Sequence, residues 1–313
     1  MARGFSRLAS RLLPGVLVSA GMALSAAAQV VDVEDVATEP SKEAYTINGG
    51  WDYMAKTSVK HQTNFSRGDF RAGVGGKWDL ADHLSLDTRF SYQLNSYKFT
   101  NDGYPFDWSN INNYTLLGLL NWQLDDKWSL LGGPLIRYSG EGSADWKHSA
   151  SYGGLLGFNW LSSKDLSLGL AVGVVSQIED KAGIVPIPMI RWHFADDFTL
   201  RTGVIPLGGR MGLGPELTYN FAKDFDLSVG AQYQRSRYRL NDHAANAQGI
   251  GEDTSLPIYA KFAWRPVEAA SVELFAGVVA GGGLKTQDQD GNHAFDHHYD
   301  TAPTVGMRGE YRF

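Results

Sequence analysis

Polar and apolar side chains alternate along most of this chain with a period of two. In the segment 70–80 every second residue, beginning with Phe70, is apolar or glycine, and Arg71, Lys77 and Asp79 stand between them. Successive side chains of a β-strand point to opposite faces, so this pattern gives a strand one face for hydrocarbon and one for water. A helix of the same length would place these charges on every side. About fourteen segments between residues 45 and 313 show the alternation, which predicts an all-β chain.

The connections between the predicted strands are of two kinds that alternate along the chain. One kind is a short polar turn between large apolar residues, and the other is mostly longer and polar. The short turns are residues 80–84, 124–128, 161–166, 194–198 and 221–225, and the long loops are residues 55–66, 100–112, 140–149, 241–254 and 285–300. Single-chain outer-membrane barrels have tight periplasmic turns, longer extracellular loops and an even number of strands. The sequence therefore predicts a transmembrane antiparallel up-and-down β-barrel of about fourteen strands.

Large aromatic residues gather beside the short turns, for example Trp78, Trp122, Trp128, Trp192 and Phe198. The core of a soluble β-sandwich gives aromatic residues no reason to collect beside one class of turn. Membrane barrels, in contrast, carry a girdle of aromatic residues where the hydrocarbon meets water. The pattern favours a membrane barrel whose short turns lie at the periplasmic interface.

The first 28 residues have the features of an export signal. Three arginines in the first eleven residues precede an apolar stretch too short to span a bilayer, and Ala26 to Ala28 fit a small-residue cleavage site. We predict a signal peptide over residues 1–28, a flexible periplasmic lead-in over residues 29–44 and the barrel over residues 45–313. The signal and the absence of cysteine favour the outer membrane of a Gram-negative bacterium. We expect outer-membrane lipid to surround the barrel as its partner and the long loops to be extracellular.

The chain ends on an aromatic residue, Phe313, with Tyr311 two positions before it on the same face of the last predicted strand. This ending resembles the terminal signal by which bacterial barrels are recognised for insertion. We therefore expect Tyr311 and Phe313 to act as an assembly signal read by the barrel-assembly machinery.

One segment carries a family resemblance. Residues 184–194 read Ile-Val-Pro-Ile-Pro-Met-Ile-Arg-Trp-His-Phe, and a turn leads from them into Phe198 and on to Pro206. This region resembles an uncharacterised family of bacterial outer-membrane β-barrel proteins, a domain of unknown function. The resemblance implies an outer-membrane barrel and no particular substrate. Because Pro186 and Pro188 lack an N–H donor, they predict a bulge or weakened strand pairing at this place.

Charge and motif content argue against several other functions. The chain has 28 Lys and Arg against 34 Asp and Glu, a net charge of −6, whereas a nucleic-acid binder needs a basic face. A lipase-like barrel would need a His and a Ser on one face, but His148 lies at odd spacing from Ser149 and Ser151. The aspartate pairs at 125–126 and 196–197 fall in short turns, the wrong end for a barrel protease. We expect no enzyme activity, no cofactor and no nucleic-acid partner.

The loop 285–300 is rich in metal-ligating residue types. Asp288, Asp290 and Asn292 resemble the start of a calcium loop, but Gly291 stands one position too early and the twelfth position is Tyr299, where an EF-hand has Glu. A solvated polar loop is the favoured reading, and a divalent-metal cluster with neighbouring histidines is the alternative.

The polar face of the alternation supplies candidate lumen-lining residues. They are Arg71, Arg89, Arg137, Arg191, Arg201, Glu216, Lys261, Glu273, Arg308 and Glu310. Fourteen strands lie between small barrels, which side chains fill, and porins with 16–18 strands and an aqueous channel. We predict a narrow porin-like channel for passive transport of small polar solutes. The alternative is a non-conducting structural or surface-interaction barrel, closed by pairs among these charges.

Overall fold

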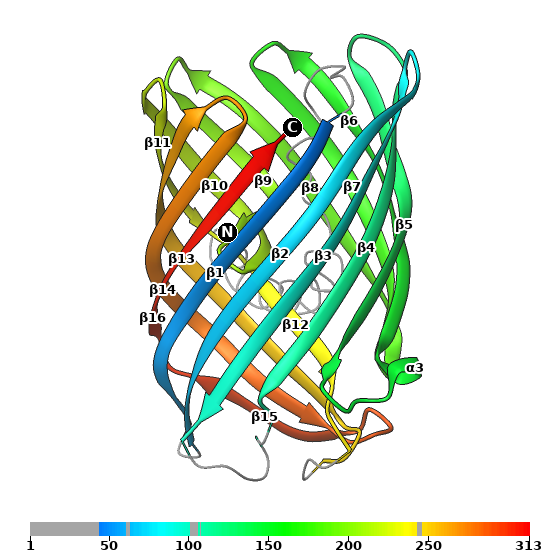
Figure 1. The fold of residues 1–313 in the computed structure, drawn as a ribbon, viewed down its shortest axis with the longest axis vertical. Helices are drawn as coiled ribbons and strands as arrows, with labels where there is room; N and C mark the ends of the chain where they lie inside the picture. Colours follow the sequence, from blue (N-terminus) through cyan, green and yellow to red (C-terminus); the bar gives the residue numbers. More distant parts are fainter. Residues whose placement is uncertain (1–43, 61–62, 101–105, 107, 243–245) are drawn as a thin grey trace, which may run out of the picture.

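The computed structural model describes residues 44–60, 63–100, 106, 108–242 and 246–313. The predicted signal peptide and all of the predicted lead-in except Ala44 lie outside these residues. The elements, shown in Figure 1, are β1 Ala44–Val59, β2 Thr63–Ala81, β3 Leu84–Phe99, β4 Asn110–Gln123, β5 Trp128–Glu141, α3 Trp146–Ser149, β6 Ala150–Ser163, β7 Leu166–Gln177, β8 Asp180–Ala195, β9 Phe198–Leu207, β10 Arg210–Ala222, β11 Phe225–Ala231, β12 Gln234–Arg239, β13 Ile250–Val267, β14 Ala270–Gln287, β15 His293–Tyr299 and β16 Ala302–Arg312.

These segments form a closed antiparallel barrel with fourteen strand positions around its wall, so the predicted fold is confirmed. We call each of these positions a stave. Two of the staves are interrupted strands. β11 and β12 pair with successive stretches of β13, and β15 and β16 pair with successive stretches of β14. The cylinder closes where β1 pairs with β16, from Thr46 opposite Arg312 to Met54 opposite Thr304.

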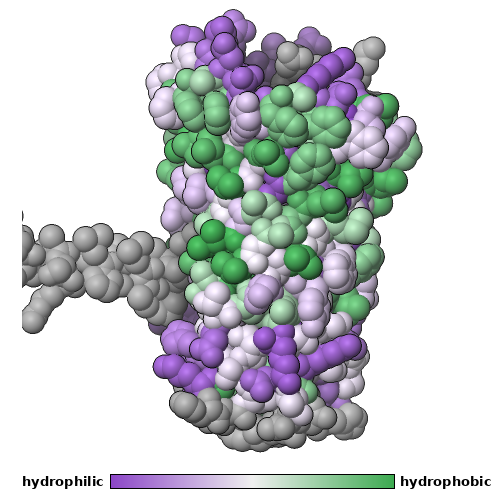
Figure 2. Space-filling model, turned by 90° about the vertical axis from the view of Figure 1, so that its left-hand side faces the viewer, coloured by the Kyte–Doolittle hydropathy of each residue, from purple (hydrophilic) through white to green (hydrophobic). Residues whose placement is uncertain are grey.

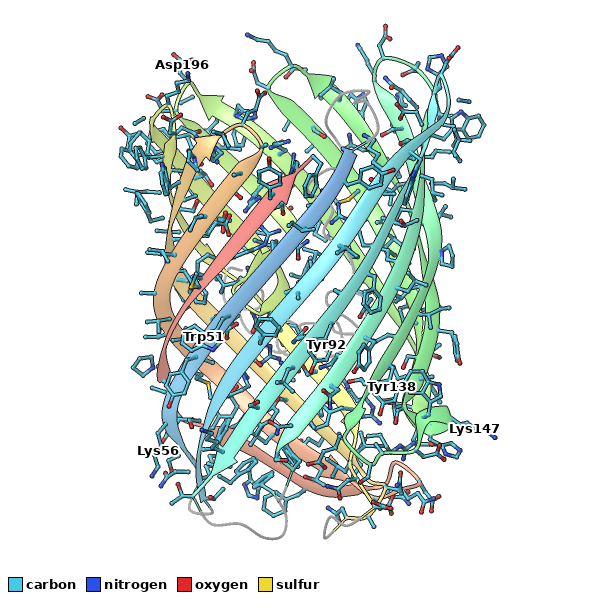
Figure 3. The ribbon with its side chains drawn as sticks, in the orientation of Figure 1. Trp51, Lys56, Tyr92, Tyr138, Lys147 and Asp196 are labelled. Carbon is cyan, nitrogen blue, oxygen red and sulfur yellow. The ribbon has the colours of Figure 1, made fainter. Side chains whose placement is uncertain are left out.

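The two ends of the barrel differ. The predicted short turns lie together at one end, the top of Figure 1, which also holds the last residues of the chain. We call this the short-turn end and the opposite end, where α3 lies, the loop end. Asp196 marks the former and Lys147 the latter in Figure 3. The predicted loops 55–66 and 285–300 are largely strand, because β1, β2, β14 and β15 extend beyond the apolar segments. The described residues contain no helix long and apolar enough to span a membrane.

The outer surface is apolar over the middle of the barrel. Figure 2 shows hydrophobic side chains over much of the height of one face, with hydrophilic residues gathered toward both ends. On the outer surface Val74, Leu116 and Leu156 are 53%, 51% and 71% exposed, which in water would be an unfavourable arrangement. In hydrocarbon the same exposure costs nothing, and most backbone groups of the wall are paired between neighbouring strands. The alternation in the sequence thus sets the membrane-facing side of each strand.

We expect Val74→Arg to lower the free energy of unfolding in lipid vesicles by roughly 2–4 kcal/mol, because Val74 faces outward near the middle of β2. The matched control is Val74→Leu, which keeps the outward face apolar and should fold like the wild type. Denaturant titration followed by tryptophan fluorescence measures both. Equal stability of the two variants would contradict the assignment of this face.

The last strand supplies a second test. The Phe313 N–H donates to the Tyr45 carbonyl at 2.8 Å, and Tyr311 pairs with Ile47. Deleting residues 311–313 should leave β1 with unpaired backbone groups, and the chain should fail to reach the membrane fraction. The double variant Tyr311→Ala, Phe313→Ala keeps the backbone and tests the aromatic signal alone. Normal insertion of both forms would contradict both the pairing argument and the predicted assembly signal.

Candidate functional site

Part of β9 and β10 has left the barrel wall and lies inside the lumen. All residues from Gly203 to Leu213 are buried, whereas the wall strands alternate between buried and exposed positions. Pairing of β9 with β8 ends at Thr202 opposite Ile190. Continuous pairing of β10 with β11 begins at Glu216 opposite Gly230, and before it lies one isolated bridge between Leu213 and Tyr233. The two segments still pair with each other, from Leu207 with Arg210 onward. We call residues 203–214 the lumen hairpin.

Glycines allow both ends of the lumen hairpin to bend away from the wall. Gly203 has a φ of +134°, a conformation that residues with a side chain rarely adopt. A Cβ atom at Gly214 would lie 1.9 Å from the carbonyl oxygen of Ala231, so the backbones of β10 and β11 meet closely there. A larger residue at either position would push the hairpin out of this path.

The departure of the lumen hairpin leaves one edge of β8, from Asp180 to Met189, without a strand partner among the described residues. The N–H of Ile190 points to this edge, since it donates to the Thr202 hydroxyl at 3.1 Å. Pro186 and Pro188, at even spacing from Ile190, would direct their N–H groups to the same edge if they had them. The weakened pairing predicted from these prolines is confirmed on this edge, while their pairing with β7 is intact. The prolines remove donors that would be unpaired.

The tip of the lumen hairpin is held by a buried charge cluster, which we call the tip cluster. Its members are Asp52, Arg67, Asp69, Arg210 and Asp253, with exposed fractions between 0% and 4%. Arg210, on the hairpin, contacts the Asp253 carboxylate at 3.2 Å, and the neighbouring Gly209 N–H donates to Asp52 at 2.7 Å. On the wall, Arg67 bridges Asp69 at 2.7 Å and Asp253 at 2.5 Å. The cluster therefore ties the hairpin to strands on the far side of the lumen.

Neutral groups complete the tip cluster. The hydroxyls of Tyr97 and Tyr299 donate to Asp253 at 2.9 and 3.3 Å, and Asn95 donates to Asp69. Buried charges are tolerated only when they are paired and hydrogen-bonded in this way. None of the five charged residues of the tip cluster is among the predicted lining residues. Arg210 lies between two predicted strands and Asp253 in a predicted loop, so only the register across the lumen could have identified them.

The lumen hairpin also has an apolar face. Val204, Met211 and Leu213 pack against inward-facing residues of β4 to β8, which form one buried apolar cluster: Leu117, Leu119, Leu131, Leu135, Leu155, Ala171, Val175, Val185, Ile187 and Met189. The inward face of this half of the wall is therefore partly apolar, where the alternation predicted a face for water. The hairpin covers these residues, which would otherwise face an aqueous lumen.

Six of the ten predicted lining residues form a line of ion pairs along the other half of the wall. Arg201 pairs with Glu216 at 2.6 Å, and Glu216 and Glu273 lie 3.1 and 3.4 Å from the Lys261 ammonium. The line continues through two further pairs, Arg308 with Glu273 at 4.0 Å and Arg308 with Glu310 at 2.6 Å. These charges pair with neighbours along the wall, so this half of the bore is polar.

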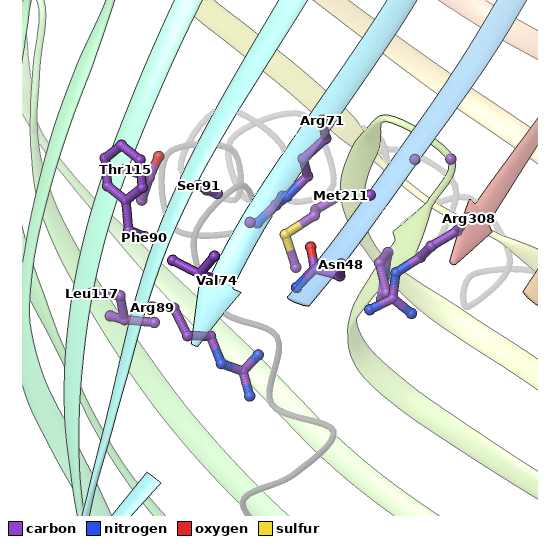
Figure 4. A pocket seen from close by; sticks show the side chains of 15 residues that line it. Asn48, Arg71, Val74, Arg89, Phe90, Ser91, Thr115, Leu117, Met211 and Arg308 are labelled. Atoms are coloured by element: carbon purple, nitrogen blue, oxygen red, sulfur yellow. The ribbon is translucent and has the colours of Figure 1, made fainter. Parts of the chain in front are cut away.

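The remaining predicted residues lie in three places. Arg71 and Arg89 line a small cavity together with Arg308, Asn48 and, from the lumen hairpin, Met211, as Figure 4 shows. Arg191 stands opposite Arg201 in the register of β8 and β9. Arg137 lies toward the loop end of β5, apart from the others, and donates to Asn113.

The loop rich in metal-ligating residue types forms a hydrogen-bonded turn. Asp288 accepts from the backbone N–H groups of Asp290 and Asn292 at 3.0 and 2.8 Å, and from the Asn292 side chain at 3.0 Å. Within the described residues, no group of three or more His, Asp or Glu side chains is placed to hold a metal ion. The Asp288 carboxylate is thus used to shape the turn between β14 and β15.

A closed fourteen-stave barrel with an apolar outer surface has the fold of outer-membrane β-barrel proteins. The chain is similar to the COG4313 outer membrane channel from Pseudomonas putida F1, with 10% identity, a TM-score of 0.51, and coverage of 90% of this chain and 100% of that one. It is also similar to a Pseudomonas aeruginosa FadL homologue, with 13% identity, a TM-score of 0.49, and coverage of 94% and 93%. No family model and no curated protein sequence matches the chain, so the resemblance to an uncharacterised family stays a prediction.

The tip cluster makes a specific prediction about stability. Asp253→Ala would leave Arg67 and Arg210 buried without their shared carboxylate, and we expect the free energy of unfolding to fall by about 3–5 kcal/mol. Asp196→Ala removes an exposed carboxylate in a short turn and should change it by less than about 0.5 kcal/mol. Denaturant titration in vesicles compares the two. Similar small effects would mean that the cluster does not stabilise the barrel.

Proposed function

We propose that this protein is an outer-membrane channel for passive transport of small polar solutes and that the lumen hairpin is its gate. The observation that carries the proposal is the placement of the hairpin: it fills the middle of a lumen whose other half is lined by charged side chains. The fold it shares with outer-membrane barrels and the apolar outer surface support the membrane location.

Two features support a movable hairpin. Its tip is held by polar contacts, such as the 3.2 Å pair of Arg210 with Asp253, which water can replace when the lumen is hydrated. Its ends are glycines, which bend at low cost. Movement of the hairpin toward the free edge of β8 would open the cavity that Arg71, Arg89 and Arg308 line.

The second candidate is a non-conducting barrel. The same hairpin favours it, since the tip cluster and the apolar cluster fill the lumen at one level. The two candidates differ in one measurable property, the conductance of the purified protein in a planar bilayer.

A disulfide across the lumen tests the gate. A Cβ atom at Gly208 would lie 2.8 Å from the Cβ of Asp52, and a disulfide needs about 3.8 Å, so a shift of about 1 Å allows the double variant Asp52→Cys, Gly208→Cys to form one. The chain has no other cysteine. We expect single-channel steps from the wild type, none from the oxidised double variant, and their return after reduction.

The single variant Asp52→Cys is the control, and reductant should leave its conductance unchanged. Equal conductance of the oxidised and reduced double variant would show that the hairpin is not the gate. Silence of the wild type after verified reconstitution would instead favour the non-conducting barrel and contradict the proposed channel.

A further inference from the structure

A second, small cavity lies between the inner face of β5 to β7 and the inward-curved strand β12. The residues that line it include three serines, the three arginines Arg137, Arg235 and Arg237, and the aliphatic residues Val175 and Ile178. We call it the arginine pocket. Among the described residues that line it, three carry guanidinium groups and none carries a carboxylate. It shares no lining residue with the cavity of Figure 4.

The charges at the arginine pocket are only partly compensated. Arg235 and Arg237, two positions apart on β12, both reach the same carboxylate, that of Glu252, at 2.5 and 3.2 Å. Arg137 is 8% exposed and donates to Asn113 and Ser139 at 3.0 and 3.3 Å. In the described part of the chain, no carboxylate forms an ion pair with it. A buried cation without a counter-charge is unfavourable, so this pocket is suited to an anion.

Arg237 adds an unused donor. Its Nε donates to the Ile178 carbonyl at 2.9 Å and its Nη1 to Glu252, but its Nη2 is buried without a hydrogen-bond partner among the described residues. The side chain is 9% exposed. Guanidinium groups bind carboxylates through two parallel N–H donors, and Arg237, which lines the pocket, has one such donor that no described residue uses.

The arginine pocket also has apolar lining residues. Val175 and Ile178 line it, and Val175 also belongs to the buried apolar cluster that continues through Ala171 and Val185. A ligand seated here would meet aliphatic side chains as well as guanidinium and hydroxyl donors. Inorganic anions can use only the donors.

We propose that the arginine pocket binds an organic monocarboxylate, with its carboxylate at Arg137 and Arg237 and its apolar body against Val175 and Ile178. This inference names a solute class for the channel proposed above and rests on that function for its biological meaning. The binding itself requires no conduction. A binding measurement in detergent micelles therefore fails or succeeds independently of the conductance experiment.

Isothermal titration of the purified full chain with benzoate tests the proposal, with benzyl alcohol as the neutral analogue and inorganic phosphate as the anion without an apolar body. We expect saturable binding of benzoate at millimolar or lower concentration, and binding at least tenfold weaker for the other two. Arg137→Gln and Arg237→Gln should each weaken benzoate binding at least tenfold. Arg312→Gln, at the short-turn end, should leave it unchanged, and heat-modifiable gel migration checks that each variant is folded.

Each other outcome would overturn the proposal. Equal affinity for benzoate and benzyl alcohol would exclude recognition of the carboxylate, and equal affinity for benzoate and phosphate would exclude a role for the apolar wall. Unchanged benzoate binding in both glutamine variants would exclude this pocket as the site. Where a glutamine variant fails to fold, Arg137→Lys replaces it. Lysine keeps the positive charge but lacks the two parallel N–H donors of a guanidinium group, so Arg137→Lys should also weaken benzoate binding.

Discussion

The requirement that every backbone donor in hydrocarbon be satisfied governs this structure. The cylinder meets this requirement by closing through the pairing of β1 with β16. The departure of the lumen hairpin is the most costly feature of the wall, because it ends the pairing of β8 with β9 at Ile190. The edge of β8 that this departure exposes is the place where Pro186 and Pro188 stand, with no N–H to leave unpaired. The proline segment and the hairpin therefore depend on each other. A strand pair can leave a membrane barrel only beside a neighbouring strand whose edge tolerates the loss of its pairing partner.

Moving a strand pair into the lumen also determines what the lumen can hold. The hairpin is covered on both faces, so it needs an apolar partner on one side and polar partners at its tip. The inward residues of β4 to β8 supply the first, and the tip cluster around Asp253 supplies the second. The ion pairs from Arg201 to Glu310 remain on the half of the wall that the hairpin does not cover. The division of the bore into an apolar and a charged half follows from this placement.

The sequence alone was sufficient for the barrel, its stave number and the outward face, because alternation and turn length are local properties. It was also sufficient for the weakened pairing at Pro186 and Pro188. It was not sufficient for the lumen hairpin, since Val204 to Leu213 read like any strand pair and only their burial on both faces distinguishes them. Arg67, Arg210 and Asp253 come from strands far apart in the chain, so their meeting depends on barrel register and on the inward fold. The alternation of side chains along a strand could not distinguish Arg137, which lies at the arginine pocket, from the residues of the line of ion pairs.

The lumen hairpin and the arginine pocket meet on one strand, β12. Ser236 accepts a hydrogen bond from Arg210 of the tip cluster at 2.9 Å, and its neighbours Arg235 and Arg237 belong to the pocket. Successive residues of a strand face opposite sides, so β12 presents one side to the hairpin and the other to the pocket. Displacing the hairpin tip removes a contact that positions this strand. If an anion at the pocket favours one position of β12, then by linkage the hairpin position must alter anion affinity by the same factor.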